Sequence, residues 1–468
     1  MLEKLFKLKE NGTDIKTEIL AGITTFMTMA YILAVNPTTL TGFNELLGYQ
    51  SGDAGYMNPS GVFIATALAA CLGCFFMAFF ANYPFALAPG MGLNAYFAYT
   101  VVLQYGYSWQ VALAAVFVEG IIFILLSLTN VREAIFDAIP QTLKYAVSCS
   151  IGLFIAFIGL QSAGIATANE NTLVQICDFS ADTFSTAGIC AILALLGVLI
   201  TAIMLVKNVK GGILIGILAT WILGIICQLT GIYQVTPDAG YYSLLPDFSK
   251  GLQIGAIADV AFKVDFSHIT SGGLFNFIVV ICAFLFVDMF DTLGTLIGVS
   301  TKANMLDKDG KLPHIKGALM ADAVATSFGA LLGTSTTTTF VESATGVTEG
   351  GGTGLTAFTT GVLFALSVLF SPIFLAIPGF ATAPALIIVG FYMMGSVSNI
   401  DFNEMSEGIP AFLCIIAMPL FYSISDGIFF GVISYVLINL ITGKAKEKKI
   451  SLLMYVLTIL FVLKYAFL

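Results

Sequence analysis

Charged side chains are scarce in this sequence. They make up 10% of its 468 residues, against 58% for hydrophobic residues, and the mean hydropathy is +0.95. A soluble domain carries roughly 25% charged residues, so the composition indicates a chain that crosses a membrane many times. The formal net charge of −9 points to no partner such as nucleic acid, because in a membrane protein the placement of charge matters more than its sum.

Histidine and paired cysteine are also nearly missing. The two histidines, His268 and His314, lie near the ends of apolar runs, and among eight cysteines only Cys177 lies in an expected loop. Cys71 and Cys74 have no second pair or histidine nearby to complete a metal site, so we expect them to pack inside a helix. An intramembrane enzyme would need a nucleophile with its base, or a metal. We therefore expect no enzyme, no disulfide framework, no metal and no cofactor.

The N-terminal segment lacks the features of a cleavable signal peptide. Its first sixteen residues are polar and carry lysine, and no small-residue cleavage site follows the first apolar run. We expect that run to be the first membrane span.

Apolar runs of roughly 20 residues mark membrane-spanning helices. The sequence predicts fourteen spans, at residues 17–37, 59–80, 83–103, 109–128, 141–163, 187–206, 211–231, 274–299, 315–333, 335–353, 355–374, 377–397, 408–423 and 425–442. A last apolar run, 451–467, closely follows a lysine cluster and carries Lys464. We expect this run to lie along the cytoplasmic face or at the periphery rather than to form a fifteenth span.

The distribution of lysine and arginine predicts the orientation. With a cytoplasmic N-terminus, sixteen of the 19 fall inside, Lys250 and Lys263 fall outside, and Lys464 lies in the terminal run. This agrees with the positive-inside rule and predicts a multi-pass membrane protein with a cytoplasmic N-terminus.

The two halves of the chain echo each other. An Ala-Ile-Pro motif precedes the fifth span at 138–140 and opens the twelfth at 376–378, and GGILIG (211–216) corresponds to DGIFFG (426–431). Seven spans plus seven place the second half upside down relative to the first, as in transporters built from inverted repeats.

The third span cannot be a continuous helix. Its interior contains Pro84, Pro89, Gly90, Gly92 and Asn94. Proline removes a backbone donor and clashes with the preceding turn, and glycine weakens a helix. Irregular backbone at membrane depth is tolerated only where it is buried in protein or lines a cavity.

The tenth span is interrupted at the corresponding place. Threonines 336–339 favour an extended conformation, and Glu342, Gly346 and a triple glycine at 350–352 follow them. Interrupted spans at matching positions in two halves are the best sequence pointer to the binding site of a transporter.

The eighth span carries two acids in an apolar run, FLFVDMFDTLGTLIG (284–298). Asp288 and Asp291 are three residues apart and share roughly one helix face with Thr292 and Thr295. Two carboxylates in a low-dielectric site do not readily ionise together, so one of them is a candidate proton carrier. The alternative is a helix-capping or loop-facing pair near the end of the span.

Candidate substrate contacts come from the interrupted spans. Glu342 suits the N–H groups of a flat heterocycle, Phe340 suits its ring face, and Asn94 offers both a donor and an acceptor. For Phe340 the alternative is ordinary packing, and for Asn94 it is a bond to the broken backbone. Gly92 and Thr339 complete this candidate set.

Other polar side chains within the spans have simpler explanations. Glu119 and Asp322 are expected to support the site or bridge helices rather than touch the substrate. Thr24, Thr25 and Thr28 are expected to form hydrogen bonds between helices.

Four motifs together resemble one family. GITTFMTMAYILAVNP (22–37), APGMGLNAYFAY (88–99), FVDMFDTLGTLIG (286–298) and TSTTTTFVESATGV (334–347) resemble the AzgA-like purine permeases, a branch of the nucleobase–cation symporter-2 superfamily. The resemblance runs from the first span to the C-terminal tail. It implies a proton-coupled symporter of hypoxanthine, guanine or adenine, with sodium not excluded as the coupling ion.

The resemblance also implies a division of the fold. It describes an all-α polytopic membrane protein whose fourteen segments form two inverted repeats, with short antiparallel strands in segments 3 and 10. The expected parts are a cytoplasmic tail (1–16), a core domain (17–128 and 274–374), a gate domain (129–231 and 375–442), an extracellular loop (232–273) and a C-terminal tail with an apolar helix (443–468).

The resemblance assigns roles to individual residues. It implies that Asn94, Asp288 and Glu342 contact the purine and that Asp291 takes part in proton coupling, although aligned to the uracil-type motif Asp291 takes the substrate position. A homodimer through gate-domain faces is expected.

Two other transporter classes stay open on the sequence. The nearest is a uracil- or xanthine-type nucleobase symporter of the same superfamily, and the more distant is an anion transporter of seven-plus-seven architecture. Acids without lysine or arginine near spans 3 and 10 argue against an anionic substrate.

Overall fold

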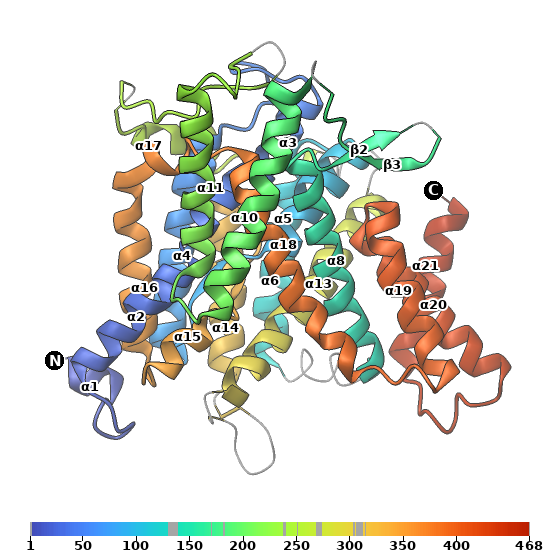
Figure 1. Ribbon diagram of the computed structural model, residues 1–468. Coiled ribbons are helices and arrows are strands. Elements are labelled where there is room, and N and C mark those ends of the chain that lie inside the picture. Colours follow the sequence, from blue (N-terminus) through green and yellow to red (C-terminus); the bar gives the residue numbers. More distant parts are fainter. Residues whose placement is uncertain are drawn as a thin grey trace.

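The computed structural model describes residues 2–129, 139–169, 171–180, 183–236, 240–249, 251–267, 274–302, 305, 312–313 and 315–467. Lys250, His268 and His314, considered above, lie outside these ranges. Figure 1 shows a bundle of long helices.

The first half of the chain contains the following elements. They are α1 (Leu2–Phe6), α2 (Ile15–Met29), α3 (Ile32–Leu46), α4 (Pro59–Phe80), β1 (Leu87–Pro89), α5 (Met91–Ala95), the π-helix η1 (Tyr96–Gln104), α6 (Trp109–Leu128), α8 (Gln141–Ser162), β2 (Ala166–Asn169), β3 (Leu173–Ile176), η2 (Phe184–Gly188), α10 (Ile189–Val206) and α11 (Gly212–Leu229).

The second half continues with a corresponding series. It comprises η4 (Ile254–Asp259), α13 (Leu274–Lys302), α14 (Ile315–Leu332), β4 (Thr337–Thr339), α15 (Ser343–Thr348), α16 (Gly354–Ser367), η5 (Val368–Phe370), α17 (Ser371–Phe374), α18 (Gly379–Met394), η6 (Gly395–Asn399), α19 (Met405–Phe421), α20 (Ile424–Ile441) and α21 (Leu452–Phe467).

The expected fourteen segments are present. Among the described residues, nine helices are long and apolar enough to cross a membrane, and three shorter apolar helices are Asn276–Met289, Met405–Phe421 and Asp426–Ile441. The interrupted third and tenth segments complete the fourteen. Local caps explain several helix starts: Asp14, Asn58 and Ser108 each accept a hydrogen bond from a backbone N–H in the first turn that follows.

The first segment extends beyond its expected end at residue 37. After a break at Ala30 and Tyr31, α3 carries the chain to Leu46. Polar residues in α3 lower the mean hydropathy, but their side chains form hydrogen bonds inside the protein. Asn36 Nδ2 donates to Thr66 Oγ1 (2.6 Å) and to Thr334 Oγ1 (3.0 Å), and Thr41 Oγ1 donates to the Pro37 carbonyl at 2.7 Å.

The two interrupted segments meet in an antiparallel strand pair, as expected. Ala88 lies opposite Thr338 at its centre, with Leu87 opposite Thr339 and Pro89 opposite Thr337. Residues 88 and 338 therefore occupy equivalent places in the two repeats, which run in opposite directions through the molecule.

Helices α8 and α18 show the same symmetry. Each begins directly after its Ala-Ile-Pro motif. They cross at Gly152 and Gly390, which stand 238 residues apart, as Pro140 and Pro378 do. A Cβ on Gly152 would lie 2.6 Å from the Gly390 carbonyl oxygen, and a Cβ on Gly390 would lie 2.3 Å from that of Gly152. This reciprocal contact confirms the inverted repeat expected from the motifs.

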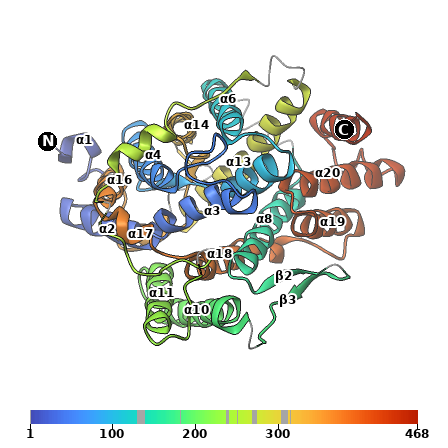
Figure 2. The ribbon, with the colours of Figure 1, turned by 90° about the horizontal axis from the view of Figure 1, so that it is seen from above.

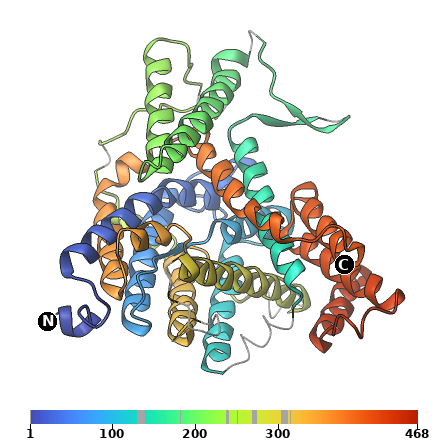
Figure 3. The same cartoon turned by 60° about the horizontal axis from the view of Figure 1, so that its bottom comes forward.

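The helices form two packed groups. Helices α2, α4, α6, α14 and α16 pack mainly on one another, and α8, α10, α11, α18, α19 and α20 form the second group. Figures 2 and 3 show α10 and α11 on one flank and α19 to α21 on another, with α8 and α18 crossing between them.

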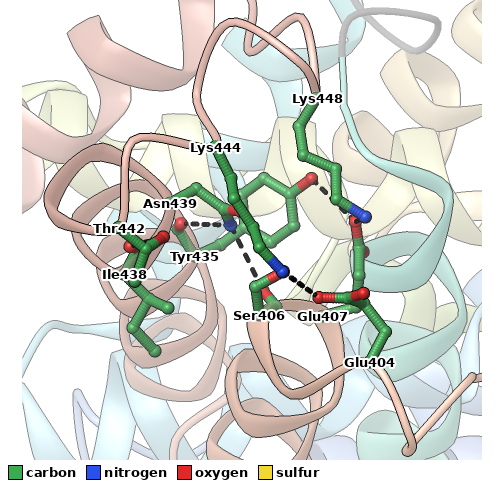
Figure 4. A network of polar contacts seen from close by, with 9 residues as sticks. All are labelled: Glu404, Ser406, Glu407, Tyr435, Ile438, Asn439, Thr442, Lys444 and Lys448. Atoms are coloured by element: carbon green, nitrogen blue, oxygen red, sulfur yellow. Dashed lines mark hydrogen bonds and ion pairs between the residues drawn. The ribbon is translucent and has the colours of Figure 1, made fainter.

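The C-terminal helix α21 packs at the periphery, beside α20 (Figures 1 and 2). A polar network holds the turn that precedes it (Figure 4). Lys444 Nζ pairs with Glu404 Oε1 at 2.7 Å and Lys448 Nζ with Glu407 Oε1 at 3.0 Å. The hydrogen bond from Lys444, helped by one from Ser406, lowers the pKa of Glu404 to about 2. This network anchors the turn to the start of α19.

The crossing of α8 and α18 leads to a stability prediction. Gly152→Ala or Gly390→Ala should lower the free energy of unfolding by about 1–3 kcal/mol, because the added methyl overlaps a backbone carbonyl. Thermal unfolding in detergent, followed by size-exclusion chromatography, measures the effect. Gly395→Ala is the matched control, since a Cβ there meets no atom within 4 Å. Equal midpoints for all three variants would contradict the close crossing.

Candidate functional site

The strand pair β1–β4 forms the centre of the candidate site. Beyond the paired residues, Gly90 N donates to the Thr336 carbonyl at 2.9 Å, and Phe340 N donates to the Ala86 carbonyl at 3.0 Å. Every residue from 85 to 95 and from 334 to 340 is buried. Backbone that leaves a helix at membrane depth needs such internal partners, because the hydrocarbon offers none.

Side chains satisfy the outer edges of both strands. Thr326 Oγ1 accepts from Thr337 N and donates to the Thr337 carbonyl, each at 3.2 Å, as a neighbouring strand would. On the other strand, Cys74 Sγ accepts from Leu87 N at 3.3 Å, and Ser343 Oγ accepts from Ala86 N at 3.0 Å. Cys74 is thus a packing residue with a specific hydrogen bond.

Hydroxyl groups of the threonine run (336–339) donate hydrogen bonds to acids on other segments. Thr338 Oγ1 donates to Asp291 Oδ2 at 3.3 Å, and Thr336 Oγ1 donates to Glu119 Oε2 at 3.1 Å. Residues two apart in extended backbone point to the same side, so these acids lie along one face of the segment. Thr336 thus joins Glu119 of α6 to the segment that carries β4.

Glu342 lies at the start of α15 and accepts a hydrogen bond from a tyrosine. Tyr31, fully buried at the break between α2 and α3, donates to Glu342 Oε1 at 2.8 Å. Glu342 is only half-buried. Tyr31 is not among the candidate residues indicated by the sequence. The sequence signal for it is its position within the first motif (22–37), where one helix ends and the next begins.

The two aspartates of α13 have different surroundings. Asp291 is half-buried beside Thr338, and a Cβ on Gly90 would lie 3.4 Å from its Oδ2. Asp288 is fully buried and accepts from Thr292 Oγ1 at 3.1 Å. The same hydroxyl lies 2.9 Å from Asp322 Oδ1 on α14. Asp291 thus lies at the strand pair, whereas Asp288 is joined through Thr292 to Asp322.

The other candidate residues line the strand pair in different ways. Asn94 is fully buried, and its Oδ1 accepts a hydrogen bond from Ser335, so it links the two interrupted segments. Phe340 and Thr339 are buried, and within the described part of the chain Thr339 Oγ1 has no hydrogen-bond partner. Gly92 faces α8, because a Cβ there would lie 2.7 Å from Ile151 Cγ2.

Two threonines of α2 contact residues of α15. Thr28 Oγ1 lies 3.0 Å from Thr345 Oγ1, which joins α2 to α15, while Thr25 packs against Gly346. Across the residues that the structure describes, three or more histidine, cysteine, aspartate or glutamate side chains nowhere gather in a metal-binding arrangement.

The whole chain is similar to known permeases. The model of a permease family, that of xanthine and uracil permeases, matches residues 16–458. Guanine/hypoxanthine permease PbuO of Bacillus subtilis (strain 168) is 46% identical over 461 residues, which cover 98% of each protein. Adenine permease AdeP of Escherichia coli (strain K12) is 38% identical over 475 residues, which cover 100% of this chain and 96% of AdeP.

A solved structure shares the fold. The transmembrane domain of the cyanobacterium bicarbonate transporter BicA superposes with a TM-score of 0.60 at 14% identity, covering 89% of this chain and 97% of that domain. Its seven-plus-seven inverted-repeat fold matches the symmetry described above. At this identity the likeness concerns the fold alone.

These matches confirm the family expected from the four motifs. They also decide against an enzyme, because the matched family and relatives are transporters. The chain belongs to the nucleobase–cation symporter-2 family of xanthine and uracil permeases, and it is a multi-pass nucleobase permease.

Proposed function

We propose that this protein is a proton-coupled symporter that imports purine nucleobases across the plasma membrane. The observation that carries the proposal is the pair of half-buried carboxylates, Asp291 and Glu342, at the strand pair. The full-length similarity to a guanine/hypoxanthine permease and an adenine permease supports a purine as the substrate.

A purine base carries N–H donors from which two carboxylates can accept hydrogen bonds. Hypoxanthine and guanine carry N–H donors on both rings, and a hydrogen bond from a neutral donor to a carboxylate is stronger than a neutral pair. Thr338 Oγ1 and Tyr31 Oη already donate to one oxygen of each acid, which fixes its orientation. The second oxygen of each carboxylate would accept from the base. Phe340, on the same segment, would lie against the ring face.

The geometry favours a division of labour that differs from the one implied by the motif resemblance. Asp291 would contact the purine, because it is half-buried next to Gly90 and Thr338. Asp288 would act behind it, because it is fully buried and bonded to Thr292. Asn94 would shape the site through its hydrogen bond with Ser335 and could still offer its amide nitrogen to the purine.

The transport cycle would be alternating access of a core domain against a gate domain. The strand pair belongs to the core, with parts 17–128 and 274–374. Helices α8 and α18 belong to the gate, with parts 129–231 and 375–442. Gly92 lies against Ile151 of α8, and Tyr392 of α18 lies within electrostatic range of Glu342. A site between the two bodies is exposed to either side in turn when they move.

Orientation and assembly are part of the same proposal. The N-terminus would be cytoplasmic, which places most lysines and arginines inside. A homodimer through gate-domain faces would hold the gates still while the cores move.

The family match decides against the anion-transporter alternative, and the likeness to a bicarbonate transporter concerns the fold alone. A uracil- or xanthine-type substrate is the remaining alternative. Uptake of labelled hypoxanthine, with competition by unlabelled bases, separates the two: failure to take up hypoxanthine, or strong competition by uracil or xanthine with none by guanine or adenine, would reject the assignment to hypoxanthine, guanine and adenine.

Proton coupling gives the first functional prediction. Hypoxanthine accumulation in proteoliposomes should rise with an inward proton gradient and collapse when a protonophore is added, because the gradient supplies the driving force. Radiolabelled uptake at two pH values measures this. A sodium gradient without a proton gradient is the control. Accumulation driven by sodium alone, and unaffected by the protonophore, would reject the proton as coupling ion.

Glu342 gives the second functional prediction. Glu342→Gln should weaken hypoxanthine binding by about 10–150-fold, since a hydrogen bond to a charged group contributes ~1.5–3 kcal/mol. Tyr31→Phe leaves the carboxylate but removes its anchor, so we expect a smaller loss, about three- to tenfold. Equilibrium binding to the purified protein measures both.

The matched control is Glu349→Gln. This glutamate pairs with Lys210 at 2.5 Å, away from the strand pair, and its loss should leave hypoxanthine affinity unchanged. Normal affinity in Glu342→Gln would remove Glu342 from the site.

A further inference from the structure

A single hydroxyl joins two buried carboxyl groups behind the proposed substrate site. Thr292 Oγ1 lies 3.1 Å from Asp288 Oδ1 and 2.9 Å from Asp322 Oδ1. All three side chains are 0% exposed. Asp288 and Thr292 come from α13, and Asp322 comes from the adjacent α14. These three residues are called the Asp288–Thr292–Asp322 triad below.

The two short contacts of Thr292 Oγ1 favour one proton shared between the carboxyl groups of the triad. A threonine hydroxyl has one proton to donate, and its oxygen can accept one. Two ionised carboxylates would compete for that single proton. If one carboxyl is protonated, it donates to Thr292 Oγ1, and the hydroxyl donates to the other carboxylate, so both short contacts become hydrogen bonds. Two adjacent buried charges would each also carry a desolvation cost.

We infer that the triad stores one proton and that Asp322 is a further proton-carrying residue of transport. The inference rests on the proposed function, because it concerns the proton that accompanies the purine. The proton can move without leaving the triad: Asp288 gives its proton to Thr292 Oγ1 while the hydroxyl gives its own to Asp322. One proton shifts between the carboxyls, and the charge of the triad is unchanged.

Another buried acid, Glu18, accepts hydrogen bonds from several donors. Glu18, also 0% exposed, accepts from the backbone N–H groups of Gly352 (2.9 Å), Thr353 (3.3 Å) and Thr356 (3.2 Å), and from Thr356 Oγ1 (2.6 Å). In the triad, one hydroxyl is instead shared between two carboxyl groups.

The triad is coupled to the substrate face through Asp291. Asp291 follows Asp288 by three residues on α13 and interacts electrostatically with both Asp322 and Glu342. A proton in the triad reduces the negative charge behind Asp291 and Glu342. Purine binding, which brings N–H donors to those two acids, therefore depends on whether the triad is loaded, and the dependence is reciprocal.

Other ionisable groups near the triad are mostly acids or thiols. On elements packed against α13 and α14, the described groups are Cys71, Cys74, Tyr96, Glu119, Lys144, Tyr145, Cys149, Glu342, Asp426 and Tyr435. The two helices themselves also carry Cys282, Asp291 and Lys316, and α13 ends at Lys302. Lys316 stands in the first turn of α14, six residues before Asp322, and Lys144 stands in the first turn of α8. On α13 and α14 the sequence places no lysine or arginine within one turn of Asp288, Thr292 or Asp322.

The test separates purine exchange from proton-driven accumulation in proteoliposomes. Exchange carries the loaded protein in both directions and requires no proton release, whereas accumulation requires the proton to leave. Asp322→Asn keeps a donor to Thr292 but cannot release a proton. It should exchange labelled hypoxanthine within about threefold of the wild-type rate but accumulate at least ~10-fold less under a proton gradient. A pH dye inside the vesicles should show no purine-driven acidification.

Thr292 supplies a second pair of variants. Thr292→Val breaks the bridge without changing the side-chain volume greatly and should behave like Asp322→Asn, while Thr292→Ser keeps the hydroxyl and should behave like the wild type. Asp259→Asn is the matched control, because Asp259 is exposed and accepts from Asn58 at 2.7 Å. If Asp322→Asn does not fold, as judged by thermal unfolding, the Thr292 variants decide.

Two outcomes would overturn the inference. Normal proton-driven accumulation by Asp322→Asn would show that Asp322 carries no transported proton. Loss of exchange together with accumulation in a folded variant would place Asp322 in substrate binding instead. A wild-type protein that exchanges hypoxanthine but ignores a proton gradient would instead reject the proposed proton coupling. That result comes from the wild type alone, so it is distinct from a failure of the Asp322 and Thr292 variants.

Discussion

The antiparallel pairing of two three-residue strands is the interaction on which the site depends. Each strand interrupts a membrane-crossing segment, and hydrocarbon cannot satisfy the freed backbone groups. The strands solve this by bonding to each other, and Thr326, Cys74 and Ser343 bond to their outer edges. Because the backbone is satisfied in this way, the side chains of the threonine run remain available to the acids of α6 and α13.

Symmetry in the backbone is combined with asymmetry in the side chains. The two-fold relation centred on Ala88 and Thr338 makes Gly92 equivalent to Glu342. One repeat contributes close packing, since Gly92 lies against Ile151, and the other contributes a carboxylate. A site for an asymmetric ligand can thus arise at the centre of a symmetric scaffold.

Local sequence signals predicted most of the fold. Apolar runs marked all fourteen segments, and proline, glycine and threonine marked the two interruptions, because these effects act over a few residues. The extension of the first segment to Leu46 was not predicted, because Asn36 and Thr41 lower the hydropathy while their partners lie elsewhere in the chain or one turn back.

Contacts within the site depended on tertiary packing and were harder to predict. The acids and the threonine run stood out by composition, so the sequence placed them in one site. The bond from Tyr31 to Glu342 joins residues 311 positions apart, and the bridge from Thr292 to Asp322 joins two helices. Nothing in either local segment shows which hydroxyl meets which acid.

In the proposed function, purine and proton occupy one coupled cluster of acids around the strand pair. Calorimetry of hypoxanthine binding, repeated in buffers of different ionisation enthalpy, counts the protons taken up with the base. We expect uptake of about one proton per purine at a pH where the free protein is mostly unloaded. Binding enthalpies that are the same in every buffer across the pH range, with no proton uptake, would contradict it.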